Sequence, residues 1–96
     1  MIQVCKTLVF AHWLDALADV RARARILVRI ERLAAGNPGD VKSVGEGVAE
    51  LRIDCGPGYR VYWVRHGQAL VVLLAAGTQR TQTRDTKVAL RVPRNL

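Results

Sequence analysis

The sequence predicts an α+β domain in which a short N-terminal strand and a helical hairpin precede a three-stranded antiparallel meander and a basic C-terminal segment. Three observations lead to this prediction. Residues 48–54, 59–65 and 69–76 are short runs rich in apolar, β-branched and aromatic side chains, and breaks that contain glycine separate them. Residues 8–35 carry apolar side chains at helical spacing. Residues 80–96 hold five basic side chains and one acidic side chain.

The N-terminal third is expected to cover one face of the sheet. Residues 2–6 alternate between apolar and polar side chains, which predicts a short strand that pairs with the meander. Thr7 and Asp19 stand at the N-cap positions of two helices, and Gly36 with Pro38 ends the second one. In the second helix, one apolar arc is expected to pack on the sheet: Ala22, Ile26, Leu27, Ile30, Leu33 and Ala34.

The meander is expected to have one apolar face and one charged face. Residues 36–47 predict a glycine-rich loop and a tight curl that leads into the first meander strand. In residues 48–55 the even positions are mostly charged and the odd positions are apolar, so the charged side chains share one face. Residues 69–76 are apolar nearly throughout, which is typical of a strand in mid-sheet or covered on both faces. We therefore expect helices on one side of the sheet and exposed charges on the other.

The charge balance indicates a polyanionic or acidic partner. Fifteen basic residues face eight acidic ones, which gives a net charge of +7, and twelve of the fifteen are arginine. Arginine suits planar, bidentate contact with phosphate or carboxylate. One arginine stripe on the second helix is either a solvated face or a docking surface, and it comprises Arg21, Arg25, Arg29 and Arg32. Lys42, in the loop before the sheet, is either solvated or a phosphate contact.

The hydropathy pattern and the two cysteines indicate the cellular location and the absence of a metal or disulfide. No apolar run approaches the ~18 residues of a membrane span, and the N-terminus has no signal-peptide core, so we expect a cytoplasmic protein without a membrane partner. Cys5 and Cys55 are far apart and lack metal-ligand neighbours, which favours two small thiols over a disulfide, a nucleophile or a metal site.

Two segments carry a resemblance to a known family. The order of elements, with N-P-G-D-V-K at residues 37–42 and G-P-G-Y-R-V-Y at residues 56–62, closely resembles the RelE/ParE superfamily of toxins from type II toxin–antitoxin systems. More narrowly, the chain looks like the HigB-like group of addiction module killer proteins. The resemblance covers about residues 2–77. Beyond Gly77 the chain departs from the pattern, because Gln79 stands where the group has lysine and the last ten residues do not match.

The resemblance implies a single RelE/ParE-like toxin domain, residues 1–96, that cuts mRNA on the ribosome without a metal or other cofactor. In such enzymes the 2′-OH of the substrate attacks the adjacent phosphate, which requires a base, an acid and cations. The residues implied in catalysis are Arg60, Arg52, Tyr59 and Arg80. Those implied in nucleic-acid binding are Lys42, Arg60, Arg80, Arg84 and Lys87.

For several of these residues a structural role remains open. Tyr59, Tyr62 and His66 can supply base stacking or proton transfer. For Tyr59 and Tyr62 the alternative is a packing role in the sheet. Arg60 can form a cross-strand ion pair with Glu50 or Asp54. Asp54 would repel a phosphate unless it orients Arg52 or acts as a base.

Two other functions are compatible with the resemblance. A ParE-type toxin would poison DNA gyrase by protein contact without nuclease activity, and an inactive copy would only bind its antitoxin. All three imply a cognate antitoxin with an acidic segment that folds on a basic, partly apolar groove. We expect the antitoxin to bind at the arginine stripe of the second helix and at the basic C-terminal segment.

Overall fold

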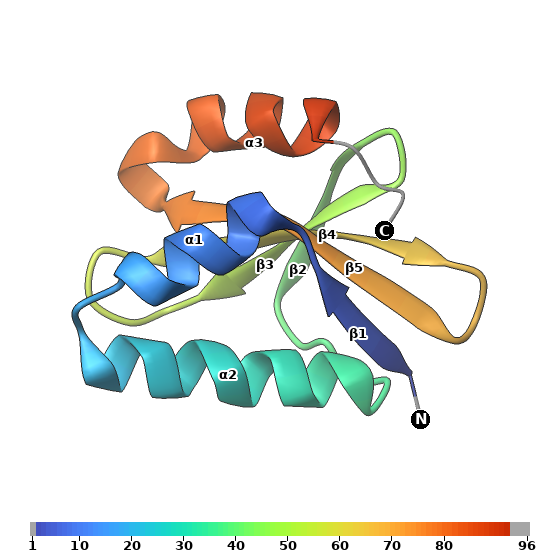
Figure 1. Ribbon diagram of the computed structural model, residues 1–96, viewed down its shortest axis with the longest axis horizontal. Helices are drawn as coiled ribbons and strands as arrows, with labels where there is room; N and C mark the ends of the chain where they lie inside the picture. Colours follow the sequence, from blue (N-terminus) through green and yellow to red (C-terminus); the bar gives the residue numbers. More distant parts are fainter. Residues whose placement is uncertain (1, 93–96) are drawn as a thin grey trace.

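A computed structural model describes residues 2–92, and it has the predicted α+β architecture (Figure 1). In this part of the chain, three α-helices and a short 3-10 helix accompany one five-stranded sheet with the strand order β1-β5-β4-β3-β2. The elements, in chain order, are β1 (Gln3–Lys6), α1 (Leu8–Ala16), α2 (Val20–Ala34), β2 (Val41–Gly45), β3 (Val48–Ile53), β4 (Tyr59–His66), β5 (Leu70–Thr78), η1 (Gln79–Thr81) and α3 (Gln82–Arg91).

The sheet contains the predicted meander and one strand that the sequence analysis missed. β3, β4 and β5 pair antiparallel, and β1 adds to β5 in parallel. β2 pairs antiparallel with β3, whereas we expected residues 41–47 to be a curl without a strand. The prediction was wrong because Gly45, Glu46 and Gly47, all with positive φ, form a tight turn that leaves only a short strand before it.

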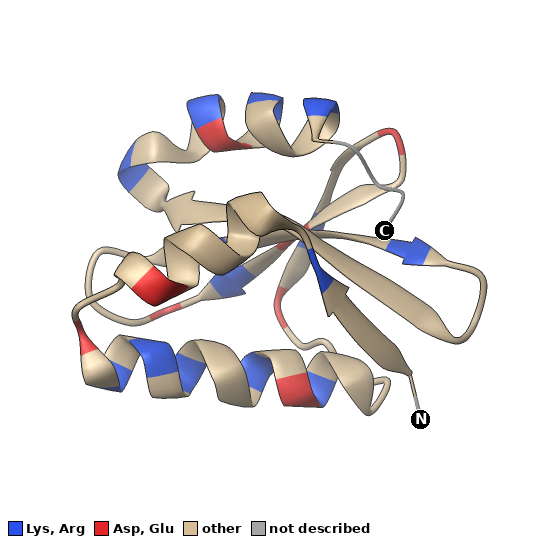
Figure 2. Cartoon of the chain, in the orientation of Figure 1, with Lys and Arg blue, Asp and Glu red and all other residues tan. Residues whose placement is uncertain are grey.

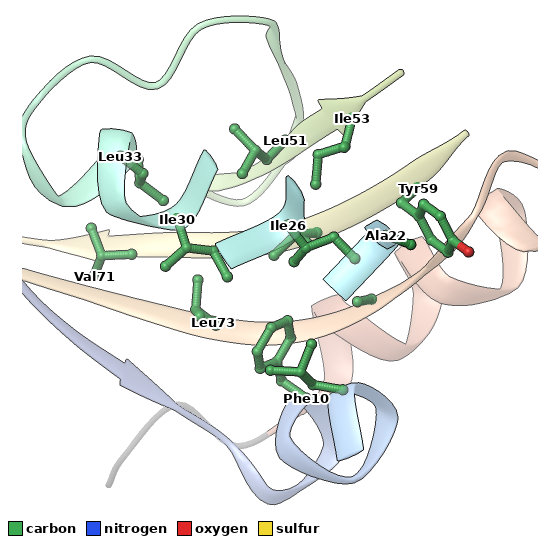
Figure 3. Close-up of a cluster of buried hydrophobic side chains, with 13 residues drawn as sticks. Phe10, Ala22, Ile26, Ile30, Leu33, Leu51, Ile53, Tyr59, Val71 and Leu73 are labelled. Carbon is green, nitrogen blue, oxygen red and sulfur yellow. The ribbon is translucent and has the colours of Figure 1, made fainter. Parts of the chain in front are cut away.

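The predicted helical hairpin covers one face of the sheet. The hydroxyl of Thr7 accepts a hydrogen bond from the Phe10 amide at 3.2 Å, and the carboxylate of Asp19 accepts one from the Ala22 amide at 3.1 Å. Both predicted N-caps are therefore confirmed. The buried side chains of the two helices pack against odd-numbered residues of the meander to form the larger core, which includes Phe10, Leu14, Ala22, Ile26, Ile30, Leu33, Leu51, Ile53, Val61, Val71 and Leu73 (Figure 3).

The opposite face of the sheet is covered in part by α3, which corrects the expectation that helices back only one side (Figure 1). Ala89 of α3 is fully buried, and it packs with the second hydrophobic cluster, which comprises Val48, Tyr62, Val64, Val72, Leu74 and Ala75. Because α1 and α3 both contact β5, this strand is covered on both faces, as its continuous apolar sequence indicated. The predicted continuation of the basic segment to Pro93 and Arg94 lies outside the described residues.

No helix within residues 2–92 combines the length and apolar character needed to cross a bilayer.

Candidate functional site

Two arginines on the α3 side of the sheet lie directly opposite each other. Arg52 of β3 and Arg60 of β4 are cross-strand partners, and Gly77 of β5 continues the same row. Residues in register on neighbouring antiparallel strands share a face of the sheet, so the fold brings together the two arginines that the sequence analysis placed in catalysis. The side chain of Arg52 is 33% exposed and that of Arg60 is 13% exposed, so both remain accessible from one side.

A fully buried carboxylate, Glu50, lies between the two guanidinium groups. Its Oε1 accepts a hydrogen bond from Nε of Arg52 at 3.1 Å and lies 3.8 Å from Nε of Arg60, while the side chain itself is 0% exposed. The sequence analysis considered Glu50 only as an ion-pair partner of Arg60, and that pairing is confirmed. What it did not reveal is that one carboxylate serves both arginines.

The second oxygen of Glu50 faces Tyr62 and the start of α3. Oε2 accepts hydrogen bonds from the Tyr62 hydroxyl at 3.1 Å and from Nε2 of Gln82 at 2.8 Å. Burial in this cluster, with a further contribution from the charge of Glu50, raises the pKa of Tyr62 to about 12. Tyr62 is therefore a neutral hydroxyl at physiological pH, and it acts here as a hydrogen-bond donor.

Lys42 belongs to the same face of the sheet. It lies on β2 as the cross-strand partner of Glu50, which is in turn the partner of Tyr62 on β4. Lys42 is exposed, so its side chain adds a third cation beside the arginine pair. Lys42 was expected in a loop before the sheet, and the structure places it within the sheet on β2.

A second buried carboxylate fixes α3 above this row. Asp85 accepts a hydrogen bond from the Thr81 hydroxyl and lies 3.4 Å from Nε of the exposed Arg84. The approach of Asp85 depends on Gly77, because a Cβ at this position would overlap the Asp85 carboxylate and lie 2.7 Å from Oγ1 of Thr81. Gly77 thus permits α3 to dock next to Arg60, its neighbour in the sheet.

Tyr59, which the resemblance placed in catalysis, lies on the other face. Its side chain is buried in the core under the helices (Figure 3). There it makes an edge-to-face contact with Trp13 at 6.0 Å between ring centroids. Burial raises the pKa of Tyr59 also. Adjacent residues of a strand point to opposite faces, so Tyr59 and Arg60 cannot both face the arginine pair. His66 is six residues beyond Arg60, roughly 20 Å along the strand, and is likewise not part of the cluster.

The basic residues of the C-terminal segment form a separate surface. Arg80 lies in η1, which follows directly on the strand that carries Gly77, so it is near the arginine-pair end of the sheet. Arg84, Lys87 and Arg91 are exposed on α3, on the side opposite Ala89 and the sheet. Figure 2 shows these basic positions along the outer side of α3. The helix therefore separates them from Arg52 and Arg60.

The arginine stripe of α2 lines a groove on the helix-covered side. A hollow of about 420 Å³ lies between α2 and the end of β3, and its walls include Ala24, Arg25, Val28, Arg29, Arg32, Ile53 and Asp54. Val28 is 46% exposed in this groove although it is apolar. Asp54 follows the last residue of β3 and faces α2, so it does not orient Arg52. Arg21 is exposed one helical turn before Arg25.

Arg29 differs from the other arginines of the stripe. Its guanidinium donates hydrogen bonds to the backbone carbonyls of Arg52, Pro38 and Asp40, the last two at 2.9 and 3.4 Å. Arg29 therefore braces the loop that leads into β2 and the strand that carries Arg52. This leaves Arg25 and Arg32, with Arg21, as the exposed cations of the stripe.

Comparison with known proteins identifies two relationships. Residues 12–92 match the family model described as "Phage derived protein Gp49-like (DUF891)". A protein of Haemophilus influenzae described as uncharacterized is 51% identical over 88 residues, which cover 92% of this chain and 89% of that protein. The matched range includes α2, the whole meander and α3, so it contains every residue of the arginine pair cluster (Glu50, Arg52, Arg60, Tyr62 and Gln82).

Proposed function

The chain belongs to the Gp49-like family of phage-derived proteins, a toxin-like family of addiction modules, and on this premise we propose that it is an mRNA endonuclease toxin. In this proposal it cuts ribosome-bound messenger RNA, arrests translation and is neutralised by a cognate antitoxin. The observation that carries the proposal is the arginine pair, in which Arg52 and Arg60 lie in cross-strand register with side chains that are 33% and 13% exposed.

The arginine pair suits the chemistry of RNA cleavage by transesterification. The 2′-OH of the substrate attacks the neighbouring phosphorus and loses its proton, a cyclic phosphate forms, and the 5′-oxygen of the next nucleotide leaves and takes a proton. Negative charge grows on the non-bridging oxygens in the transition state, and cationic donors fixed beside them stabilise it. Arg52 and Arg60 supply these donors as planar forks that match phosphate geometry. Glu50 is buried and fully engaged, so it does not take the proton of the 2′-OH.

The other basic residues position the message rather than cut it. Lys42 lies in the neighbouring row of the sheet, opposite Glu50, and Arg80 follows the strand that carries Gly77. Arg84 and Lys87 are exposed on the outer side of α3 and would hold the phosphates of a strand that continues past the site. Contacts of this kind act on the backbone of the nucleic acid and weaken with salt.

We assign the groove of α2 to the antitoxin. Its arginines favour an acidic segment, and the exposed Val28 offers an apolar anchor on the same surface. Because this groove and the arginine pair lie on opposite faces of the sheet, a segment in the groove tethers the antitoxin without blocking the site. Neutralisation therefore requires a second antitoxin segment that reaches the α3 side.

The experiment adds the purified protein to a translating extract and maps cuts in a defined message by primer extension. We expect cuts in ribosome-bound message that vanish when the ribosomes are omitted and when the antitoxin is present in excess. Intact message together with arrested translation would contradict the nuclease proposal.

One observation favours a second candidate function, poisoning of DNA gyrase. Tyr59, implied in catalysis by the nuclease resemblance, is buried on the opposite face from the arginine pair. A supercoiling assay with purified gyrase separates the two functions. Inhibition of gyrase with intact message supports the second candidate, whereas cut message with normal supercoiling supports the first.

A further inference from the structure

Glu50 is the most heavily engaged side chain on the α3 face of the sheet. Each of its oxygens serves two neighbours: Oε1 faces the Nε atoms of Arg52 and Arg60 at 3.1 and 3.8 Å, and Oε2 accepts from Tyr62 and Gln82 at 3.1 and 2.8 Å. The four partners come from three elements, β3, β4 and α3. Burial of a carboxylate is costly unless it is paired and hydrogen-bonded, and this one meets both conditions.

The way in which Glu50 holds the arginines leaves their outer edges open. The Glu50 carboxylate lies next to the Nε atoms of both guanidinium groups. Within residues 2–92 the terminal nitrogens of Arg52 have no hydrogen-bond acceptor. In the same part of the chain Arg60 makes one hydrogen bond, from Nη1 to the carbonyl of Tyr59 at 3.5 Å, and its buried Nε has no hydrogen-bond partner beyond the ion pair with Glu50. Like charges placed directly opposite each other across two strands repel, so without Glu50 the two groups would move apart. Two non-bridging oxygens of one phosphate can accept hydrogen bonds from the terminal nitrogens of such a pair of guanidinium groups.

We propose that Glu50 is the positioning residue of the site and holds Arg52 and Arg60 at the spacing that one scissile phosphate requires. This inference rests on the proposed nuclease function. Glu50 does not touch the substrate and acts through the two arginines. Tyr62 and Gln82 orient the carboxylate from its other oxygen, so the docking of α3 also sets the geometry of the arginine pair.

The test separates positioning from charge with two variants of Glu50 and one control. Glu50→Gln keeps the shape and removes the charge, Glu50→Asp keeps the charge and retracts the carboxylate, and Glu31→Gln makes the same charge change at an exposed position of α2. Affinity is measured with a short RNA whose 2′-hydroxyls are methylated so that it cannot be cut. The cleavage rate is measured in single turnover on ribosome-bound message.

We expect both Glu50 variants to cut more slowly without losing affinity for RNA. Glu50→Gln should bind the methylated RNA at least as tightly as the wild type, because the protein gains one positive charge, yet cut about 30-fold more slowly, because the phosphate is held off its transition-state position. Glu50→Asp should bind with unchanged affinity and cut about 10-fold more slowly. Glu31→Gln should bind like Glu50→Gln and cut at the wild-type rate. A folded Glu50→Gln variant that cuts as fast as the wild type would overturn the inference.

A spectroscopic measurement decides the inference even where no cleavage is found. The Nε–H signals of Arg52 and Arg60 in proton–nitrogen spectra report the hydrogen bond of Arg52 to Glu50 and the ion pair of Arg60 with the same carboxylate, and Arg65, on the strand of Arg60, serves as the reference. Both signals should shift in Glu50→Gln while that of Arg65 stays in place, and unchanged signals would refute the positioning role. Should both Glu50 variants fail to fold, Gln82→Met removes the 2.8 Å donor to Oε2 from α3 and should shift the same two signals. No shift in that folded variant would equally refute it. Wild-type protein that shows these signals but cuts no message would instead contradict the nuclease function alone.

Discussion

Arg52 of β3 and Arg60 of β4 face each other across the sheet and both lie against Oε1 of the buried Glu50, which accepts a hydrogen bond from Arg52 at 3.1 Å and forms an ion pair with Arg60 at 3.8 Å. The shared carboxylate offsets their repulsion, so the protein can hold two cations side by side on one surface. Removal of either arginine leaves Glu50 paired with the other and with Tyr62 and Gln82. Single arginine variants should therefore fold, and their effects can be assigned to the site.

Substitution Arg60→Ala should lower the rate of message cleavage by more than about 100-fold, because the loss of ~3 kcal/mol of transition-state stabilisation corresponds to that factor. Arg60→Lys should recover only part of the rate, since an ammonium group keeps the charge but not the bidentate fork. The matched control is Arg65→Ala, which removes an exposed cation from the far end of the same strand. Equal rates for Arg60→Ala and Arg65→Ala would remove Arg60 from the site.

The tyrosines should titrate only in strongly alkaline solution. Tyr59 and Tyr62 are the two tyrosines of the chain, and burial raises the pKa of both, that of Tyr62 to about 12. Tyrosinate absorbance of the folded protein should therefore appear at a higher pH than the ordinary pKa of 10.0, and that of Tyr62 near pH 12. In Tyr62→Phe the remaining signal belongs to Tyr59. A tyrosine that titrates at its ordinary value in the folded protein would contradict the burial of that hydroxyl.

The same pKa shift makes the fold sensitive to alkali. Below pH 10 both the folded and the unfolded chain keep the proton of Tyr62, so stability does not depend on this group. Between pH 10 and about 12 the unfolded chain loses the proton first, and the free energy of unfolding should fall by at most about 1.4 kcal/mol per pH unit. Urea unfolding followed by tryptophan fluorescence measures this slope, which should be shallower in Tyr62→Phe.

Substitution Gly77→Ala should weaken the docking of α3. The new methyl group would overlap the Asp85 carboxylate and lie 2.6 Å from its Cγ, so the helix must shift at a cost of about 1–3 kcal/mol. Hydrogen exchange should become faster in α3 while α2 stays protected. The double variant Gly77→Ala with Asp85→Ala should lose less stability than the sum of the two single variants, because the new methyl group no longer meets the Asp85 carboxylate and only the contact with Oγ1 of Thr81 remains. Additive losses would show that Asp85 is not the obstacle.

Substitution Arg29→Ala should destabilise the protein by about 1.5–3 kcal/mol, because three backbone carbonyls lose a charged donor. Arg25 lies one helical turn earlier on the same helix and donates no hydrogen bond to any residue in the range 2–92. Arg25→Ala should therefore change the free energy of unfolding by less than about 0.5 kcal/mol. Denaturation in urea compares the two variants. Equal stabilities would mean that Arg29 is a solvated residue rather than a brace.

Binding of the antitoxin should weaken with salt, because the groove of α2 presents exposed arginines. The double variant Arg25→Ala with Arg32→Ala should reduce both the affinity and its salt dependence, whereas Lys6→Ala with Arg65→Ala removes the same two charges from exposed positions outside both expected contact surfaces. Titration calorimetry at several salt concentrations measures both quantities. Affinity that is independent of salt in the wild type would point instead to an apolar anchor such as Val28.

Much of the architecture followed from local patterns in the sequence. Short apolar runs separated by glycine-containing breaks predicted the three meander strands, and Thr7 and Asp19 marked the starts of two helices. Alternation placed Glu50 and Arg52 on one face, and the register of β3 and β4 brings Arg60 to the same face. It also separates Tyr59 from Arg60, so the sequence already contained the reason to keep Tyr59 out of the site.

Other features depended on contacts between segments that are distant in the chain. β2 was not predicted because the glycines at and after its end indicated a loop. Its pairing with β3 brings Lys42 opposite Glu50. Asp54 was expected next to Arg52, but β3 ends one residue earlier and Asp54 faces α2. Gln82 reaches Glu50 from 32 residues away only because α3 docks on the second face of the sheet.

The sequence by itself therefore determined most of the strands and helices, which residues of a strand share a face, and that the protein is strongly basic. The first two properties arise from the periodicity of neighbouring side chains, and the third from composition. Only the tertiary structure decided that α3 covers the second face and that one buried carboxylate serves two arginines. Such contacts depend on which apolar faces bury each other, and a buried charge survives only where the assembled fold supplies its partners.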